Sequence, residues 1–351
     1  MTTARGGIHL VGSVPLSDAE TVFRTVSGAL NPFLRRITDG ETGRRGRWIW
    51  FQREMLLEHP DMEVDTDDPP YALYQWDGQL LRETPYVRFK AGVDPASVEF
   101  PTGYAEAALE SFDLYTQLQS DGVIGQDMLF QVSLPTPMAT AYMYVSPDAR
   151  GDYIPAYERS LLGALGEIVA SVPHDKLSIQ WDVCQEVLIF EDYFPQRPDD
   201  YKGQVFAELG RLGNAVPDAV DLGYHLCYGS PRDEHLVMPQ DMGILVEIAN
   251  GVSEALDRRL NYVHMPVPQD RTDAAYFRPL RGLELADETE VMLGLIHYDD
   301  EDGDCARMDT ALRFLASFGV ATECGWGRTN PNRVPGLLVS HRLAIDYLIN
   351  G

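Results

Sequence analysis

Short runs of β-branched and other apolar residues alternate along this chain with longer stretches in which apolar residues recur at helical spacing. The short runs predict strands at residues 7–14, 34–40, 128–134, 177–184, 221–228, 259–265, 291–297 and 319–324. The amphipathic stretches predict helices at residues 104–119, 156–170, 202–214, 239–256 and 304–318. Ser17 and Glu20 form a capping-box pattern that predicts a further helix start just before Val22.

This alternation predicts an α/β fold in which eight parallel strands close into one (β/α)8 TIM barrel. No Ser/Gly-rich linker and no break in composition divides the chain, so we expect residues 1–351 to form a single domain. The segment 42–127 after the second predicted strand is longer than one crossover needs and contains Pro69–Pro70. It predicts an insertion that shapes the mouth of the barrel.

Charge and hydropathy exclude several classes of partner. The 28 Lys and Arg residues against 54 Asp and Glu residues give a net charge of −26. Such a chain repels phosphate backbones and anionic membrane surfaces, so we expect neither a nucleic acid nor a membrane as partner. No apolar run is long enough for a membrane span, and no apolar signal segment precedes the first strand, so we expect a cytoplasmic protein.

The predicted strand ends carry most of the candidate chemistry, because active sites of such barrels lie at the carboxyl ends of the strands. Four of the eight ends hold a His or a Cys, and the full set of end residues is Ser13, Glu41, Pro135, Asp182, His225 with Cys227, His264, His297 and Cys324. His225 and Cys227 are two residues apart and face the same side of their strand. With Cys324 as a second thiolate, this donor set favours zinc.

The fourth ligand has two candidates at this stage. Glu247 lies near Cys227 in the chain, but its helical segment would sit on the outside of the barrel. His264 ends the next predicted strand, so we favour His264 over Glu247. The alternative for His264 is a structural hydrogen bond to Asp270 or to a backbone carbonyl. Of the remaining cysteines, we expect Cys184 to line the mouth of the barrel or to be a bystander, and Cys305 to pack on its helix.

Six segments resemble the catalytic barrel of cobalamin-independent methionine synthase, in the superfamily that includes uroporphyrinogen decarboxylase. They are LVGSVPL at 10–16, DGETGRR at 39–45, IQWD at 179–182, HLCYG at 225–229, IHYDD at 296–300 and ECGWGR at 323–328. In this order they cover nearly the whole chain, and HLCYG together with ECGWGR is the most specific pair.

The resemblance implies a zinc ion held by His225, Cys227 and Cys324. It also implies contacts to a thiol substrate from Ser13, Glu41 and Asp182, and proton transfer by His297 near the methyl donor. The chain departs from the family at His264, where the family has a ligand glutamate, and at 133–137, where the family's folate-stacking tryptophan is not evident. No counterpart of the family's N-terminal duplicate domain is evident either.

We therefore expect a zinc-dependent methyltransferase that alkylates a small-molecule thiol, with a donor other than folate polyglutamate. A corrinoid or methyl-carrier protein is a candidate partner. Zinc would keep the thiol deprotonated, Glu41 and Asp182 would hold a substrate ammonium, and Asp182 and His297 are the catalytic candidates. The alternatives are a zinc hydrolase or lyase, a non-catalytic thiol-binding protein, and a decarboxylase that holds carboxylates with Arg44, Arg45 and Arg47.

Overall fold

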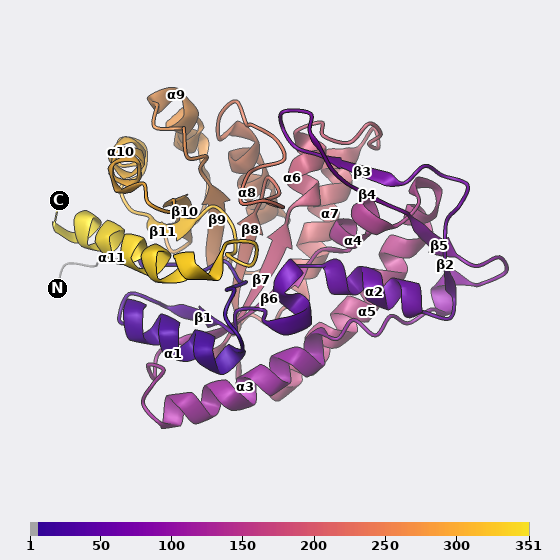
Figure 1. The fold of residues 1–351 in the computed structure, drawn as a ribbon, viewed down its shortest axis with the longest axis horizontal. Helices are drawn as coiled ribbons and strands as arrows, with labels where there is room; N and C mark the ends of the chain where they lie inside the picture. Colours follow the sequence, from indigo (N-terminus) through magenta and orange to yellow (C-terminus); the bar gives the residue numbers. More distant parts are fainter. Residues whose placement is uncertain (1–5, 351) are drawn as a thin grey trace.

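A curled sheet of seven parallel strands forms the centre of the structure, a computed structural model that describes residues 6–350 (Figure 1). Across the sheet, the strands are β1 (Arg36–Thr38), β6 (Leu129–Pro135), β7 (Leu177–Val183), β8 (Asp221–Leu226), β9 (Tyr262–Pro266), β10 (Glu290–Ile296) and β11 (Gly319–Thr322). Each strand overlaps one of the predicted segments, and all neighbouring pairs are parallel. The predicted α/β class and its parallel sheet are therefore confirmed.

The sheet is a half-barrel rather than a closed eight-stranded barrel, because the predicted strand at 7–14 contributes only one bridging residue. Ile8 makes a parallel bridge to Leu34, just before β1, and another to Val320 of β11. Beyond Ile8, the chain leaves the line of the sheet, and the Gln131 side-chain amide donates to two consecutive backbone carbonyls there. Hydrogen bonds from a side chain inside the half-barrel thus take the place of the backbone hydrogen bonds that an eighth strand would make.

Helices alternate with the strands as predicted and pack around the sheet (Figure 1). The longer ones are α1 (Ala19–Leu30), α3 (Tyr104–Ser120), α5 (Arg150–Ser171), α7 (Tyr201–Asn214), α8 (Gly243–Ala255), α10 (Glu301–Ala311) and α11 (Val334–Asn350). Helix α1 is capped by Asp18 and not by Ser17, since the Asp18 carboxylate accepts the N–H of Thr21 at 2.7 Å. Over residues 6–350, no helix combines the length and the apolar character needed to cross a bilayer.

The segment after β1 adds a helix and two small antiparallel sheets at one side of the sheet (Figure 1). It holds α2 (Trp50–Glu58), with β2 (Met62–Val64) paired to β5 (Val87–Phe89) and β3 (Tyr71–Tyr74) paired to β4 (Leu80–Thr84). This extra structure ends at residue 103, earlier than the predicted 127, because α3 packs against α1 and β6 as a crossover helix does. Residues of α2, β3 and β4 line the cavity described below.

A buried ion pair joins the strands at the end of the sheet opposite to that cavity. Arg36 of β1 donates to both carboxylate oxygens of Asp221 of β8, at 2.5 and 2.9 Å, and to Glu290 of β10 at 2.7 Å. The guanidinium carbon also lies 3.9 Å from the centroid of the Tyr262 ring. At the amino-terminal end of the sheet, these contacts hold β1, β8 and β10 together and have a structural role. The carboxyl ends of the strands remain free for chemistry.

Candidate metal centre and active site

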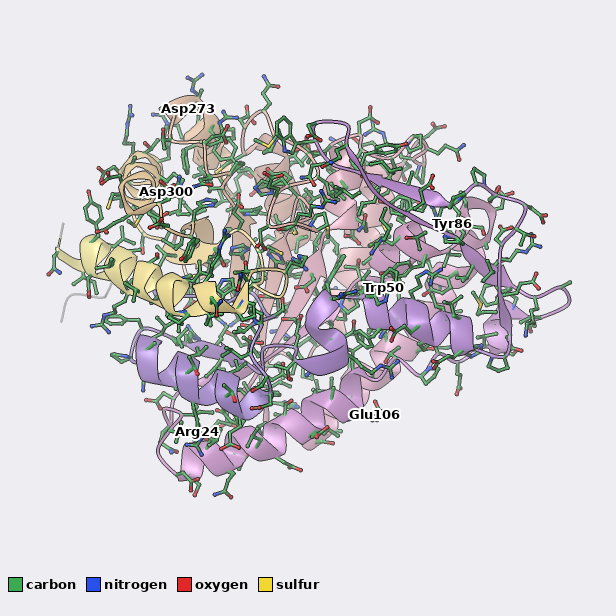
Figure 2. The ribbon with its side chains drawn as sticks, viewed as in Figure 1. Arg24, Trp50, Tyr86, Glu106, Asp273 and Asp300 are labelled. Carbon is green, nitrogen blue, oxygen red and sulfur yellow. The ribbon has the colours of Figure 1, made fainter. Side chains whose placement is uncertain are left out.

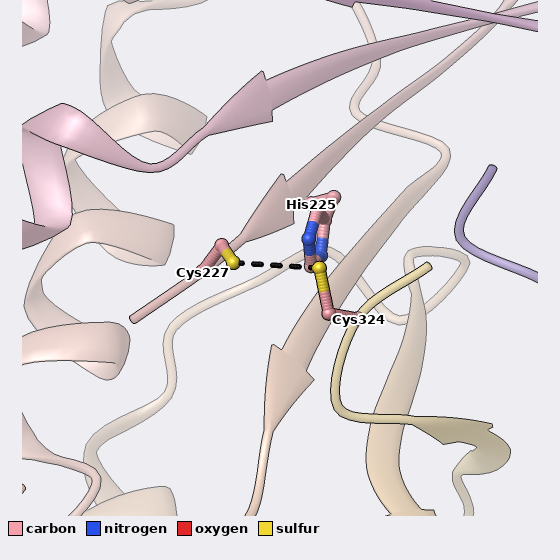
Figure 3. Close-up of side chains that lie close together, drawn as sticks. All are labelled: His225, Cys227 and Cys324. Atoms are coloured by element: carbon pink, nitrogen blue, oxygen red, sulfur yellow. Dashed lines mark hydrogen bonds between the residues drawn. The ribbon is translucent and has the colours of Figure 1, made fainter. Parts of the chain in front are cut away.

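His225, Cys227 and Cys324 bring three donor atoms together at the carboxyl ends of two strands (Figure 3). His225 lies in β8, Cys227 follows directly after it, and Cys324 follows β11. The two sulfur atoms are 3.7 Å apart, and one ligand atom from each residue lies within 4.8 Å of the others. The side chains of His225 and Cys227 therefore reach the same place, as their two-residue spacing predicted.

Hydrogen bonds fix which nitrogen of His225 is available. The carbonyl of Thr322 can only accept, so His264 carries its proton on Nε2 and donates to it at 3.0 Å. The bare Nδ1 of His264 then accepts from Nδ1–H of His225 at 2.7 Å. Nε2 of His225 is left with its lone pair, buried and without a hydrogen-bond partner among residues 6–350.

The thiol groups have hydrogen-bond donors that suit a negative charge on sulfur. The backbone N–H of Gly229 donates to Cys227 Sγ at 3.3 Å, and the guanidinium of Arg328 donates to Cys324 Sγ at 3.3 Å. The pKa of Cys324 is nevertheless raised, first by the Cys227 thiol beside it and then by burial. Two such thiolates can coexist here only beside a strong positive charge.

The donor set therefore fits zinc. Burial lowers the pKa of His225, which keeps the imidazole neutral, and the neutral ring is the form that binds metal ions. One imidazole nitrogen and two thiolate sulfurs form a soft set that zinc accepts. The orphaned Nε2 of His225 is the observation that most directly calls for such an ion, since buried polar atoms are rarely left unpaired.

The two candidates for a fourth ligand lie elsewhere. His264 is fully buried in β9 opposite His225, but both of its ring nitrogens are engaged, one with His225 and one with a backbone carbonyl. Glu247 lies on α8 outside the sheet and pairs with Lys202, its side chain 43% exposed. Neither residue joins the group of three donor atoms.

One cavity of about 510 Å³ brings most of the remaining predicted residues to the same place. Its wall includes Ser13, Glu41, Asp182, His225, Cys227 and Cys324. Trp50 of α2 (labelled in Figure 2) and Arg82 of β4 line it from the extra segment, with the guanidinium carbon of Arg82 4.6 Å from the Trp50 ring centroid. Metal donors and carboxylates thus face a common space.

Glu41, which is half-buried, and Asp182, which is buried, are carboxyl groups with raised pKa values. Burial and the nearby Asp182 raise the pKa of Glu41 to about 8. Burial raises the pKa of Asp182 to about 7, although this carboxylate accepts hydrogen bonds from Gln180 at 2.9 Å and from Trp48 at 3.2 Å. A pair of acids held in this way is suited to receive a cationic group, which would favour their charged forms.

Ser13 has a structural hydrogen bond besides its place in the wall. Its Oγ accepts the backbone N–H of Gly327 at 3.1 Å, and its carbonyl accepts that of Trp326 at 2.7 Å. These bonds tie the segment after Ile8 to the loop that carries Cys324. Ser13 therefore helps to position the metal donors as well as the wall of the cavity.

Of the three arginines predicted to hold a carboxylate in a decarboxylase, two form ion pairs and one lines the cavity. Arg45 pairs with Asp39 at 2.5 Å, and the exposed Arg44 pairs with Glu54 at 3.1 Å. Arg47 does line the cavity. Sequence reasoning missed Arg328, which reaches Cys324 from four residues further along the same loop; its place in ECGWGR was the available signal.

His297 lies beside the metal donors but in a neighbouring cavity of about 140 Å³, which it shares with Glu323 and Cys324. Its Nε2–H donates to the carbonyl of Val267 at 3.0 Å, so its bare Nδ1 faces Glu323 Oε2 at 3.8 Å. Glu323 also accepts a hydrogen bond from His235. Neither Glu323 nor His235 was predicted from the sequence, although Glu323 directly precedes Cys324 in the chain.

Comparison with known proteins gives a likeness of fold. No family model matches the chain, and no curated protein matches it. The B12-independent methionine synthase from Shewanella sp. W3-18-1, solved in complex with selenomethionine, superposes with a TM-score of 0.65 at 14% identity, over 99% of this chain and 98% of that one. A provisional vitamin-B12-independent methionine synthase from Listeria monocytogenes gives 0.57 at 13% identity, over 98% and 99%. At such identities the likeness shows a shared fold over nearly the whole of each chain.

Proposed function

We propose that this protein is a zinc-dependent enzyme that transfers a methyl or other alkyl group to the sulfur of a small thiol. The observation that carries the proposal is the orphaned Nε2 of His225 beside the sulfur atoms of Cys227 and Cys324, in the same cavity as Glu41 and Asp182. The similar fold of the Shewanella methionine synthase supports it, and the selenomethionine bound to that protein is an amino-acid selenoether. We further propose that residues 1–351 act as one domain.

The chemistry divides between the metal and the chain. Zinc, when bound, keeps a thiol deprotonated and nucleophilic at neutral pH. We assign the binding of the substrate's ammonium group to Glu41 and Asp182, whose raised pKa values fall when a cation enters. In the transfer, the bond between the alkyl carbon and its donor breaks as the sulfur–carbon bond forms, and the leaving group takes up the proton that the substrate thiol has lost.

We assign the handling of that proton to His297. Its Nδ1 carries no proton in the resting arrangement, because Nε2–H is held by a carbonyl. The carboxylate of Glu323 lies within reach of the same nitrogen and stabilises a proton there. A neutral His297 can thus accept a proton at Nδ1 and pass it on without a change of ring orientation.

The test of this function is thiol alkylation by zinc-loaded protein. Homocysteine, cysteine and a thiol without an amine are offered with S-adenosylmethionine, a methylated folate or a methylated corrinoid, and thioether products are detected by mass spectrometry. We expect a thioether from an amino-acid thiol, lost after chelation and restored by zinc. A fully zinc-loaded protein that binds thiols tightly and yields no thioether with any donor would favour a binding protein instead.

His264 should act on the metal centre through His225 and not as a ligand. Replacing His264 with Ala removes the acceptor for Nδ1–H of His225, so the ring loses its fixed orientation, and zinc affinity is expected to fall about 10–100-fold. His264→Gln keeps an acceptor oxygen and should restore part of the affinity, and Glu247→Gln on α8 is the matched control with unchanged affinity. Chelator competition measures all three; equal losses in the Ala and Gln variants would contradict a positioning role.

A further inference from the structure

Three of the four cysteines lie at the same cavity, and only two of them belong to the group of donor atoms described above. Cys184 directly follows β7, the strand next to β8. In the register of this pair, Asp182 lies opposite His225 and the next residue of β7 lies opposite Leu226. One further step in the same register sets Cys184 beside Cys227.

The backbone holds this arrangement in place. The N–H of Cys227 donates to the carbonyl of Val183 at 2.9 Å, which continues the pairing of the two strands up to the cysteines. On the other side, α6 (Gln185–Phe190) begins immediately after Cys184. The position of the Cys184 backbone is therefore fixed from both directions, and only its side-chain torsion remains to be set.

Cys184 is buried, with 4% of its surface exposed, yet it lines the same cavity as His225, Cys227 and Cys324. Its sulfur has one weak contact, from the Gln185 amide at 3.9 Å. Its sulfur lies outside the group of three close donors, so joining them takes a change of rotamer.

We propose that Cys184 is the fourth protein ligand of this metal centre and the one that a substrate thiol replaces. The proposal rests on the zinc centre proposed above. Zinc prefers four tetrahedral ligands, and three sulfurs with one imidazole nitrogen are an ordinary set for it. His264 and Glu247, the other two candidates, are engaged elsewhere. Three thiolates and one Zn²⁺ ion together carry a net charge of −1. The guanidinium of Arg328 beside Cys324 offsets this charge.

The exchange of one thiol for another also balances protons and charge. As the substrate thiol enters, its S–H bond breaks and an S–H bond forms on Cys184, so one thiolate replaces another. No external base is needed, and the charge of the centre does not change. Because Cys184 faces the cavity, its departure leaves the vacated ligand position open to the space where the substrate binds.

Two measurements test the assignment without an activity assay. Zinc-edge X-ray absorption on the wild-type protein without substrate is expected to give three sulfur neighbours at about 2.3 Å and one nitrogen neighbour. Cobalt(II)-loaded protein gives thiolate charge-transfer absorption in the near ultraviolet, which should fall by about one third in Cys184→Ser as three thiolates become two. Zinc affinity of this variant should fall at least about tenfold.

Cys305→Ser is the matched control, because Cys305 lies on α10, away from the cavity, and its loss should change neither spectrum nor affinity. Cys184→Ala, which offers no oxygen ligand, should behave like the Ser variant. Two sulfur neighbours in the wild type, with Cys184 variants equal to the wild type, would overturn the Cys184 assignment and leave the zinc centre intact. A wild type that binds no metal would overturn the centre itself. The wild-type X-ray measurement does not depend on how well any variant folds.

Discussion

Purified wild-type protein is expected to contain about one zinc ion per chain, and the variants Cys227→Ser and Cys324→Ser essentially none. Each substitution removes a thiolate from a group whose two sulfur atoms are 3.7 Å apart. The thiolates that remain and the Nε2 of His225 no longer make up a full tetrahedral set, and the introduced serine does not complete it, because a serine hydroxyl is not deprotonated at neutral pH as a zinc-bound thiol is. Elemental analysis after dialysis measures the ratio, and alkyl transfer should disappear together with the metal.

The controls for this loss are already present in the chain. Cys305→Ser removes a thiol from α10 and should keep the full zinc content. Thermal unfolding of each variant, compared with wild-type protein treated with chelator, separates loss of the ion from loss of the fold. Zinc retained in both Cys227→Ser and Cys324→Ser would place the ion elsewhere. A folded wild type that contains no zinc, even after reconstitution, would contradict zinc-dependent thiol activation. It would favour a decarboxylase or a binding protein instead.

The parallel sheet could be predicted because its strands are buried on both sides. Leu177–Val183 (LSIQWDV), for example, alternates apolar and polar residues with the two-residue period of a strand, and all seven residues are buried. The same reasoning failed at residues 7–14, where the apolar run is equally clear. There, the side chain of Gln131 in β6, on the far side of β1, donates to the backbone carbonyls, and no local pattern reveals a donor so distant in sequence.

That His225, Cys227 and Cys324 come together could be predicted from the two-residue period of a strand and from the parallel topology. His225 and Cys227 share a side of one strand, and Cys324 follows another strand whose carboxyl end must lie at the same edge. The hydrogen bonds of His264 could not be predicted, because they depend on which ring nitrogen meets a carbonyl. A sequence pattern can bring a histidine to the right edge, but only the hydrogen bonds decide whether it binds the metal or orients another ligand.

Cys184 lines the cavity, as one of the two expectations from the sequence had it, but its neighbour could not be predicted. Its position directly after a predicted strand was visible in the sequence, but its neighbour depends on the register between β7 and β8. That register sets Cys184 beside Cys227, and a shift by one residue would turn the thiol to the other side of the sheet. Register between parallel strands joined by long crossovers is set by packing of the whole sheet, so a single sequence does not specify it.

A pair of buried carboxyl groups outside the active site escaped prediction altogether. Glu186 of α6 and Glu208 of α7 are both almost fully buried, and neither oxygen of Glu186 has a hydrogen-bond partner among residues 6–350 by ordinary geometric limits. Burial raises the pKa of Glu186 to about 7, and burial together with Glu186 raises that of Glu208. In the sequence, Glu208 looks like an ordinary acid on the predicted helix 202–214, and Glu186 like an acid in the connection after the predicted strand 177–184.

Replacing Glu186 with Gln is therefore expected to stabilise the protein above neutral pH. Because the folded-state pKa of Glu186 lies above its unfolded value, the carboxyl group contributes most to stability below that unfolded value. This contribution is lost as the pH rises through about 7. Glutamine has the same shape and no charge to bury, so its advantage over glutamate should be larger at pH 8 than at pH 5, by about 1–3 kcal/mol. Chemical denaturation at both pH values measures the difference, with the exposed Glu167→Gln on α5 as the matched control. An equal effect of Glu186→Gln at the two pH values would mean that burial does not hold Glu186 protonated.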